Sequence, residues 1–171
     1  MTLVEITIAM GVMTLAMVMF SGVIANTARL GSEKRQSSVA AHAARSLLER
    51  MRCQPFDQVW ALYNADPSDD PDGVGTAPGA AFEVAGLEPL ADDPDGFVGL
   101  VNMPAGEVGL SEELTDETLG MPRDLNGDSL IDAKDHSADY AILPVLITIE
   151  WQSPSGPRRL EMQTMLVGMD G

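Results

Sequence analysis

Oxygen-bearing side chains alternate along residues 124–135, which read DLNGDSLIDAKD. Counted as a calcium-binding loop of about twelve residues, this segment places side-chain oxygens at the first, third, fifth, ninth and twelfth positions and a backbone carbonyl at the seventh. Ca²⁺ takes about six to eight oxygen ligands, and alternate residues of a curled loop converge on one point. The predicted ligands are Asp124, Asn126, Asp128, Leu130 through its carbonyl, Asp132 and Asp135.

The loop departs from the usual calcium pattern in several places. Its sixth position is Ser129 rather than glycine, and the final ligand is an aspartate where a longer, bidentate glutamate is usual. No long helix is indicated on either side, so a complete helix–loop–helix unit is not expected. We expect Ile131 to turn toward the core and His136 to be exposed. A structural Ca²⁺ is the favoured interpretation, and a loop of Asx turns with solvated acids is the alternative.

A second reactive group is Glu5, the only charged residue among residues 1–25. An unpaired carboxylate within a membrane costs roughly 2.5–3.5 kcal/mol on insertion scales, so it needs a cationic partner. The nearest candidate is an N-terminal amine, either that of its own chain, about one helical turn away, or that of a neighbouring chain. We favour the neighbouring chain, because such a pair sets the axial register between subunits.

The elements that carry these groups divide the chain into three parts. Residues 1–27 form an apolar segment long enough to span a bilayer. Residues 28–53 predict an amphipathic helix that continues it, with an apolar stripe at Val39, Ala43, Leu47 and Met51. Cys53-Gln54-Pro55 should end this helix, since the residue before proline disfavours helical geometry.

The N-terminal sequence MTLVE, followed by an apolar helix of about twenty residues, resembles the mature N-terminus of a type IV pilin or pseudopilin. In that family a prepilin peptidase removes a short basic leader and methylates the new first residue, which here is Met1 in place of the usual phenylalanine. A glutamate at the fifth position is typical, and Glu5 matches it. We therefore expect the chain to be a mature form, with Met1 and Glu5 acting in assembly. Gly22 stands where a helix-interrupting proline is common.

Residues 54–171 predict an acidic globular head. They contain four Lys and Arg residues against twenty-three acids, whereas residues 1–53 carry a small positive charge. DDPDG occurs at 69–73 and 92–96, which predicts two similar turns rather than cation sites. The alternation in ILPVLITIEWQS and in RRLEMQTMLV predicts a C-terminal hairpin with one face in the core and one in water. The expected fold is α+β, a long helix packed on a small antiparallel sheet.

Composition excludes several functions. With a formal net charge of −16, the chain is not expected to bind nucleic acid, because phosphate would be repelled. No catalytic arrangement stands out, so we expect no enzymatic activity. Cys53 is the single cysteine, which indicates a half-buried free thiol or, as the alternative, a bridge between chains.

The resemblance implies a structural subunit of a type IV pilus or of a type II secretion pseudopilus. Its expected partners are further copies or other pilin-like subunits, the prepilin peptidase and the assembly machinery of the inner membrane. We expect it in the inner membrane before assembly and in a surface or periplasmic filament afterwards. The alternative is a single-span anchor that displays a calcium-binding head.

Overall fold

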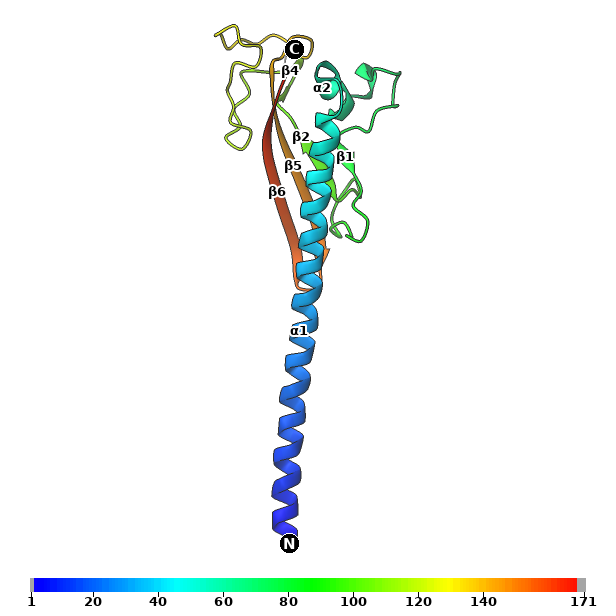
Figure 1. The fold of residues 1–171 in the computed structure, drawn as a ribbon, viewed down its shortest axis with the longest axis vertical. Helices are drawn as coiled ribbons and strands as arrows, with labels where there is room; N and C mark the ends of the chain where they lie inside the picture. Colours follow the sequence, from blue (N-terminus) through cyan, green and yellow to red (C-terminus); the bar gives the residue numbers. More distant parts are fainter. Residues whose placement is uncertain (1, 169–171) are drawn as a thin grey trace.

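A single helix runs through more than a quarter of the protein. The computed structural model describes residues 2–168, and α1 extends without interruption over Leu3–Arg52, or about 75 Å (Figure 1). Cys53 caps its C-terminal end by donating its backbone N–H to the carbonyls of Glu49 and Arg50. The helix thus ends where Cys53-Gln54-Pro55 predicted.

The head contains a four-stranded antiparallel sheet in the order β1-β2-β5-β6. Its strands are β1 (Ala81–Phe82), β2 (Gly99–Asn102), β5 (Ile142–Ser153) and β6 (Gly156–Val167). β5 and β6 pair along their whole length, from Ile142 opposite Val167 to Ser153 opposite Gly156. The long hairpin lies along the upper half of α1 (Figure 1). The predicted α+β fold is therefore confirmed.

Short elements lie in the connections, three between α1 and β1 and two between β2 and β5. They are η1 (Phe56–Gln58), α2 (Val59–Tyr63), η2 (Pro67–Asp69), β3 (Ala105–Gly106) and β4 (Gly109–Leu110). β3 and β4 form a separate two-stranded ladder. Both DDPDG segments form turns whose glycines, Gly73 and Gly96, have positive φ, a conformation that glycine adopts at little cost.

The core lies between the C-terminal half of α1 and the sheet. From α1, Leu47 and Met51 of the predicted stripe are buried, whereas its first two residues, Val39 and Ala43, are half-buried and the adjacent Ala40 and Ala44 are fully buried. The alanines let the helix approach β5 closely, where Val145, Ile147, Ile149 and Trp151 are buried. At about 1.5–3 kcal/mol for each fully buried large side chain, this contact fixes the helix to the head.

The second face of the hairpin differs from the expectation. Leu146 and Thr148 were expected to face water, but both are buried. The reason is that β5 is a central strand with side-chain neighbours on both sides: Leu146 lies between Asn102 of β2 and Gln163 of β6, and Asn102 donates to Thr148 Oγ1. The turn is also tighter than expected, since only Pro154 and Ser155 lie between the strands. Edge strand β6 keeps the expected alternation of half-buried and exposed residues.

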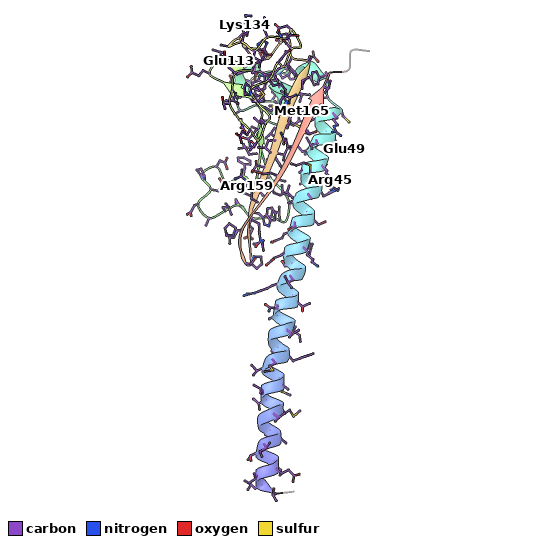
Figure 2. All side chains as sticks on the ribbon, turned by 90° about the vertical axis from the view of Figure 1, so that its left-hand side faces the viewer. Arg45, Glu49, Glu113, Lys134, Arg159 and Met165 are labelled. Atoms are coloured by element: carbon purple, nitrogen blue, oxygen red, sulfur yellow. The ribbon has the colours of Figure 1, made fainter. Side chains whose placement is uncertain are left out.

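The N-terminal half of α1 has no cover. Within the described residues, the most apolar 18-residue stretch of the helix is entirely unburied, and the helix is long and apolar enough to cross a membrane. Figure 2 shows the side chains of this half projecting away from the axis, beyond the end of the head. Leu3, Met10, Val18 and Phe20 are each more than 60% exposed. Such a continuous apolar surface requires lipid or neighbouring proteins around it.

Candidate functional site

The first half of the 124–135 loop is curled by its own side chains. Asp124 accepts the backbone N–H of Gly127 through Oδ1 at 2.6 Å and that of Ser129 through Oδ2 at 2.7 Å. Asn126 Oδ1 accepts from the N–H of Asp128 at 3.0 Å, and Asp128 Oδ1 accepts from that of Leu130 at 2.8 Å. Asn126 and Asp128 therefore form Asx turns, as the alternative interpretation expected, and Asp124 accepts two N–H groups across the bend.

The backbone also adopts the left-handed bend that such loops need. Ser129, at the sixth position, has φ = +71°, a region that non-glycine residues seldom occupy. Gly127 has φ = +83° as well. The loop thus has the bend that glycine usually provides, although a serine occupies the position.

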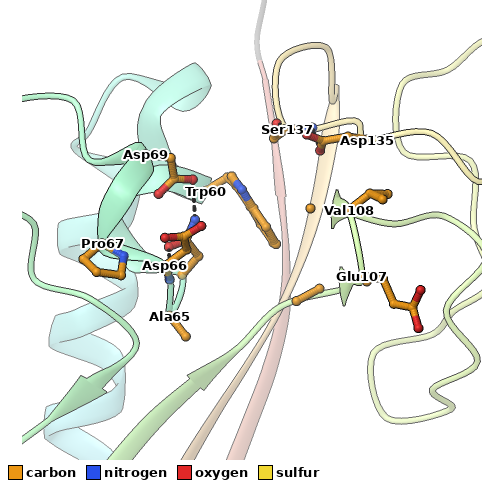
Figure 3. A pocket seen from close by; sticks show the side chains of 13 residues that line it. Trp60, Ala65, Asp66, Pro67, Asp69, Glu107, Val108, Asp135 and Ser137 are labelled. Carbon is orange, nitrogen blue, oxygen red and sulfur yellow. Dashed lines mark hydrogen bonds between the residues drawn. The ribbon is translucent and has the colours of Figure 1, made fainter. Parts of the chain in front are cut away.

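The second half of the loop is arranged differently. Asp135 Oδ1 accepts from the N–H of Leu110 on β4 at 3.1 Å and from that of Ser137 at 2.9 Å. Figure 3 shows Asp135 and Ser137 on the wall of a separate pocket, across from Asp66 and Asp69. The carboxylate of Asp135 therefore binds the backbone of β4 and of Ser137, and not the backbone of the first half of the loop.

Ile131 does not enter the core. Its side chain is exposed, as is that of Leu130, so the expected inward orientation of Ile131 is wrong. Leu125 is the residue that anchors the loop, since it is fully buried and its carbonyl accepts from the N–H groups of Ala141 and Ile142. Because Leu125 already occupies that part of the core, the apolar residues at the loop tip remain outside.

A polar cluster that is buried at Glu112 and His136 lies at the second half of the loop. It consists of Glu112, which follows β4, and of Asp132, His136 and Asp139. The Nε2 atom of His136 is 3.2 Å from Asp132 Oδ1 and 3.6 Å from Glu112 Oε2. Its Nδ1 atom is 3.1 Å from Asp139 Oδ1. His136 is 3% exposed and Glu112 is 1% exposed, so the expectation of an exposed His136 is wrong.

Backbone hydrogen bonds hold the carboxylate of Glu112 in place. Its Oε1 accepts from the N–H of Leu125 at 2.6 Å and from that of Asn126 at 3.3 Å, and its Oε2 accepts from that of Asp132 at 3.2 Å. Glu112 therefore joins the segment after β4 to both halves of the loop. Glu112, Asp132 and His136 offer ligand atoms within 4.8 Å of one another and can hold a metal ion.

The carboxylates of the cluster favour the protonated form of His136. Burial lowers the pKa of His136, but hydrogen bonds to Asp139 and Asp132 and the charge of Glu112 outweigh it, so that the pKa lies above its ordinary value. The hydrogen bond from Lys134 lowers the pKa of Asp132 to about 2. Asp132 is thus ionised at neutral pH, with one oxygen bound to Lys134 and the other facing His136.

Glu112 escaped the sequence analysis because acids recur throughout residues 107–117 and no local spacing distinguishes it. The sequence did contain a local signal for the rest of the cluster, namely the spacing of Asp132, His136 and Asp139. Asp132 lies four residues before the histidine and Asp139 three after it, and both contact its ring.

The N-terminal site has a local function that the sequence analysis also missed. Thr2 and Glu5 form a capping box, in which Glu5 donates its N–H to Thr2 Oγ1 and Thr2 donates its N–H to Glu5 Oε2, both at 3.4 Å. Met1 lies outside the described residues, so its predicted roles in assembly and methylation stay predictions. Cys53 is exposed rather than half-buried.

The architecture is pilin-like: a long N-terminal apolar helix packs through its C-terminal half on an antiparallel sheet. Comparison of the chain with protein-family models, with curated proteins and with solved structures gives no match.

Proposed function

We propose that this protein is a structural subunit of a type IV pilus-like filament, either a pilin or a pseudopilin. The observation that carries the proposal is the uncovered apolar half of α1, which continues without a break into the helix that packs on the head. Lipid would cover this surface before assembly, in the inner membrane, and the helices of neighbouring subunits would cover it in the filament. Burial of apolar surface at roughly 25 cal/mol per Å² supplies the cohesion.

The continuity of α1 favours this function over a display anchor. An anchor needs only a tether, but here the membrane-length segment and the core residues Ala40, Ala44 and Leu47 belong to one unbroken helix. Packing of the helices would therefore fix the position of every head. The acidic heads would face outward, because residues 54–171 carry most of the negative charge.

Glycines in α1 are consistent with close approach by neighbouring helices. A Cβ atom built on Gly11 or Gly22 meets nothing within 4 Å in the described chain, so no contact within the subunit explains the small residues. Each glycine weakens the helix by roughly 1 kcal/mol relative to alanine. Small residues allow apolar helices to pack at short distance, which would compensate for this cost in a filament.

Glu5 would set the register of the assembly. Its capping contacts with Thr2 are long, at 3.4 Å, and are exposed, so its carboxylate can be redirected without a large loss. A neighbour's N-terminal amine would be a stronger partner, because two opposite charges attract more strongly where water is excluded. The pair would thus contribute register more than strength.

Ca²⁺ is proposed as a structural cation of the head. Two features support binding in the first half of the loop. Its backbone curls around Asp124, Asn126 and Asp128, and it bends through left-handed geometry at Ser129. The ninth ligand of such loops often acts through water, so direct contact from Asp132 is not required. The ion would hold the loop in shape.

Substitution of Glu5 tests the filament function. Glu5→Ala should leave the chain in the membrane, since the helix only becomes more apolar, but filaments in sheared or secreted material should be strongly reduced in electron micrographs. Glu33→Ala is a matched control, because Glu33 lies on the same helix and pairs with Arg158 of its own chain. Normal filaments from Glu5→Ala would refute the role of Glu5. Purified chains that stay single, with an unmethylated Met1, would favour the membrane-anchored display module.

A further inference from the structure

We propose that Glu112, Asp132 and His136 form a site for a divalent transition-metal cation of the Zn²⁺ type, which shares only Asp132 with the predicted calcium ligands. This inference goes beyond the filament function and does not depend on it. The site lies at the second half of the loop, in the region of the head marked by Glu113 and Lys134 in Figure 2, far from the apolar half of α1.

The separations between the ligand atoms match such a cation. Zn²⁺ binds imidazole nitrogen and carboxylate oxygen at about 2.0–2.2 Å, so neighbouring ligands in a tetrahedral site lie about 3.4 Å apart. His136 Nε2 is 3.2 Å from Asp132 Oδ1 and 3.6 Å from Glu112 Oε2. All three residues offer ligand atoms within 4.8 Å of one another, so a cation between them would draw the two carboxylates together. Three protein ligands leave a fourth position for water.

The surroundings of the ligands have the form of an outer shell. Histidine ligands usually donate their second ring N–H to a carboxylate, which fixes the tautomer and the ring orientation. Asp139 Oδ1 lies 3.1 Å from His136 Nδ1 and can accept that proton, which leaves the Nε2 lone pair facing Asp132 and Glu112. The carboxylate of Glu112 is oriented by three backbone N–H groups. Each ligand is thus held before a metal binds.

The donor set selects the class of metal. Ca²⁺ prefers oxygen ligands, whereas imidazole with carboxylate suits zinc and other first-row metals. A carboxylate oxygen and a neutral histidine nitrogen are both acceptors, so Asp132 Oδ1 and Nε2 at 3.2 Å need a proton or a cation between them. With a divalent ion, the charges of Glu112, Asp132, Asp139 and Lys134 sum to zero. With a protonated His136 instead, one negative charge remains.

Nitrogen NMR on the full chain in detergent micelles tests the site, because the sequence contains only two histidines, His42 and His136. After chelator treatment, one equivalent of Zn²⁺ should shift the Nε2 signal of His136 while Nδ1 stays protonated. The exposed His42 should not respond. Excess Ca²⁺ should not reproduce this shift.

Variants separate the ligands from their neighbours. His136→Gln and Glu112→Gln should each weaken Zn²⁺ binding at least tenfold in calorimetric titration, whereas the matched controls His42→Gln and Glu113→Gln should bind like the parent chain. Asp124→Asn combined with Asp128→Asn should retain Zn²⁺ binding, which separates this site from the calcium loop. The proposal is wrong if Zn²⁺ leaves both His136 nitrogens protonated, or if His136→Gln binds as tightly as the parent. The NMR result on the parent chain decides even where a variant does not fold.

Discussion

Replacement of Glu112 by alanine should destabilise the head strongly, although the residue is a charged group in an acidic protein. Its carboxylate is 1% exposed and accepts three backbone N–H groups. The Glu112→Ala change removes both acceptor oxygens and so breaks all three hydrogen bonds at once. The effect should appear with chelator present, so it does not depend on any bound metal.

The size of the effect follows from the burial of each donor. Leu125 is fully buried, and a buried N–H without a partner costs about 1–3 kcal/mol. Asn126 and Asp132 lie nearer the surface, where water can replace the lost acceptor at small cost. Loss of the packed side chain adds about 1 kcal/mol. We expect the free energy of unfolding to fall by about 2–4 kcal/mol.

Urea unfolding of the full chain in detergent measures this change. The protein has two tryptophans, Trp60 and Trp151, and both are buried in the head, so their fluorescence reports its unfolding. Glu113→Ala is the matched control, since that residue is exposed and should change stability by less than about 0.5 kcal/mol. Equal unfolding midpoints for the two variants would show that Glu112 does not hold the loop.

Three further predictions concern other parts of the molecule. Ca²⁺ should raise the melting temperature of the head relative to chelator in calorimetry, and Asp124→Asn with Asp128→Asn should abolish that increase; no response in the parent chain would contradict the calcium proposal. Gly22→Leu should strengthen the isolated helix by about 1 kcal/mol, as judged by circular dichroism, but reduce filament yield in electron micrographs, and normal filaments would argue against close packing there. Burial raises the pKa of Tyr140 above its ordinary value of 10.0, so the stability that its neutral form contributes is present below that pH and lost above it. The free energy of unfolding in urea should therefore fall as the pH rises past about 10, and it should fall less in Tyr140→Phe.

The elements with strong periodicity were predictable from the sequence. The apolar stripe of residues 39–51 and the alternation of the C-terminal hairpin are local patterns, because the helical and strand periods depend only on neighbouring residues. Proline after Cys53 located the end of α1, and the paired DDPDG segments located two turns, because these residues restrict the backbone directly. The same local logic predicted the curl of the loop around Asp124, where each acceptor lies a few residues from its donor.

Tertiary structure decided which residues share a site. Glu112 and His136 are twenty-four residues apart in the sequence, and they meet because β4 lies beside the loop, where Leu110 accepts from the N–H of His136. The same pairing draws Asp135 to β4. No period in the sequence encodes such a contact, because its partners belong to different segments. The position of β5 between β2 and β6 likewise buried Leu146 and Thr148, which alternation assigned to water.

The sequence by itself determined a long helix with an apolar N-terminal half, an acidic head and a loop curled by its own side chains, because each depends on residues close together in the chain. Only the tertiary structure decided that His136 is buried among three carboxylates and that Ile131 is exposed, because burial depends on what the rest of the chain places nearby. The helix that joins both parts is continuous from Leu3 to Arg52, and its N-terminal half is left uncovered by the head.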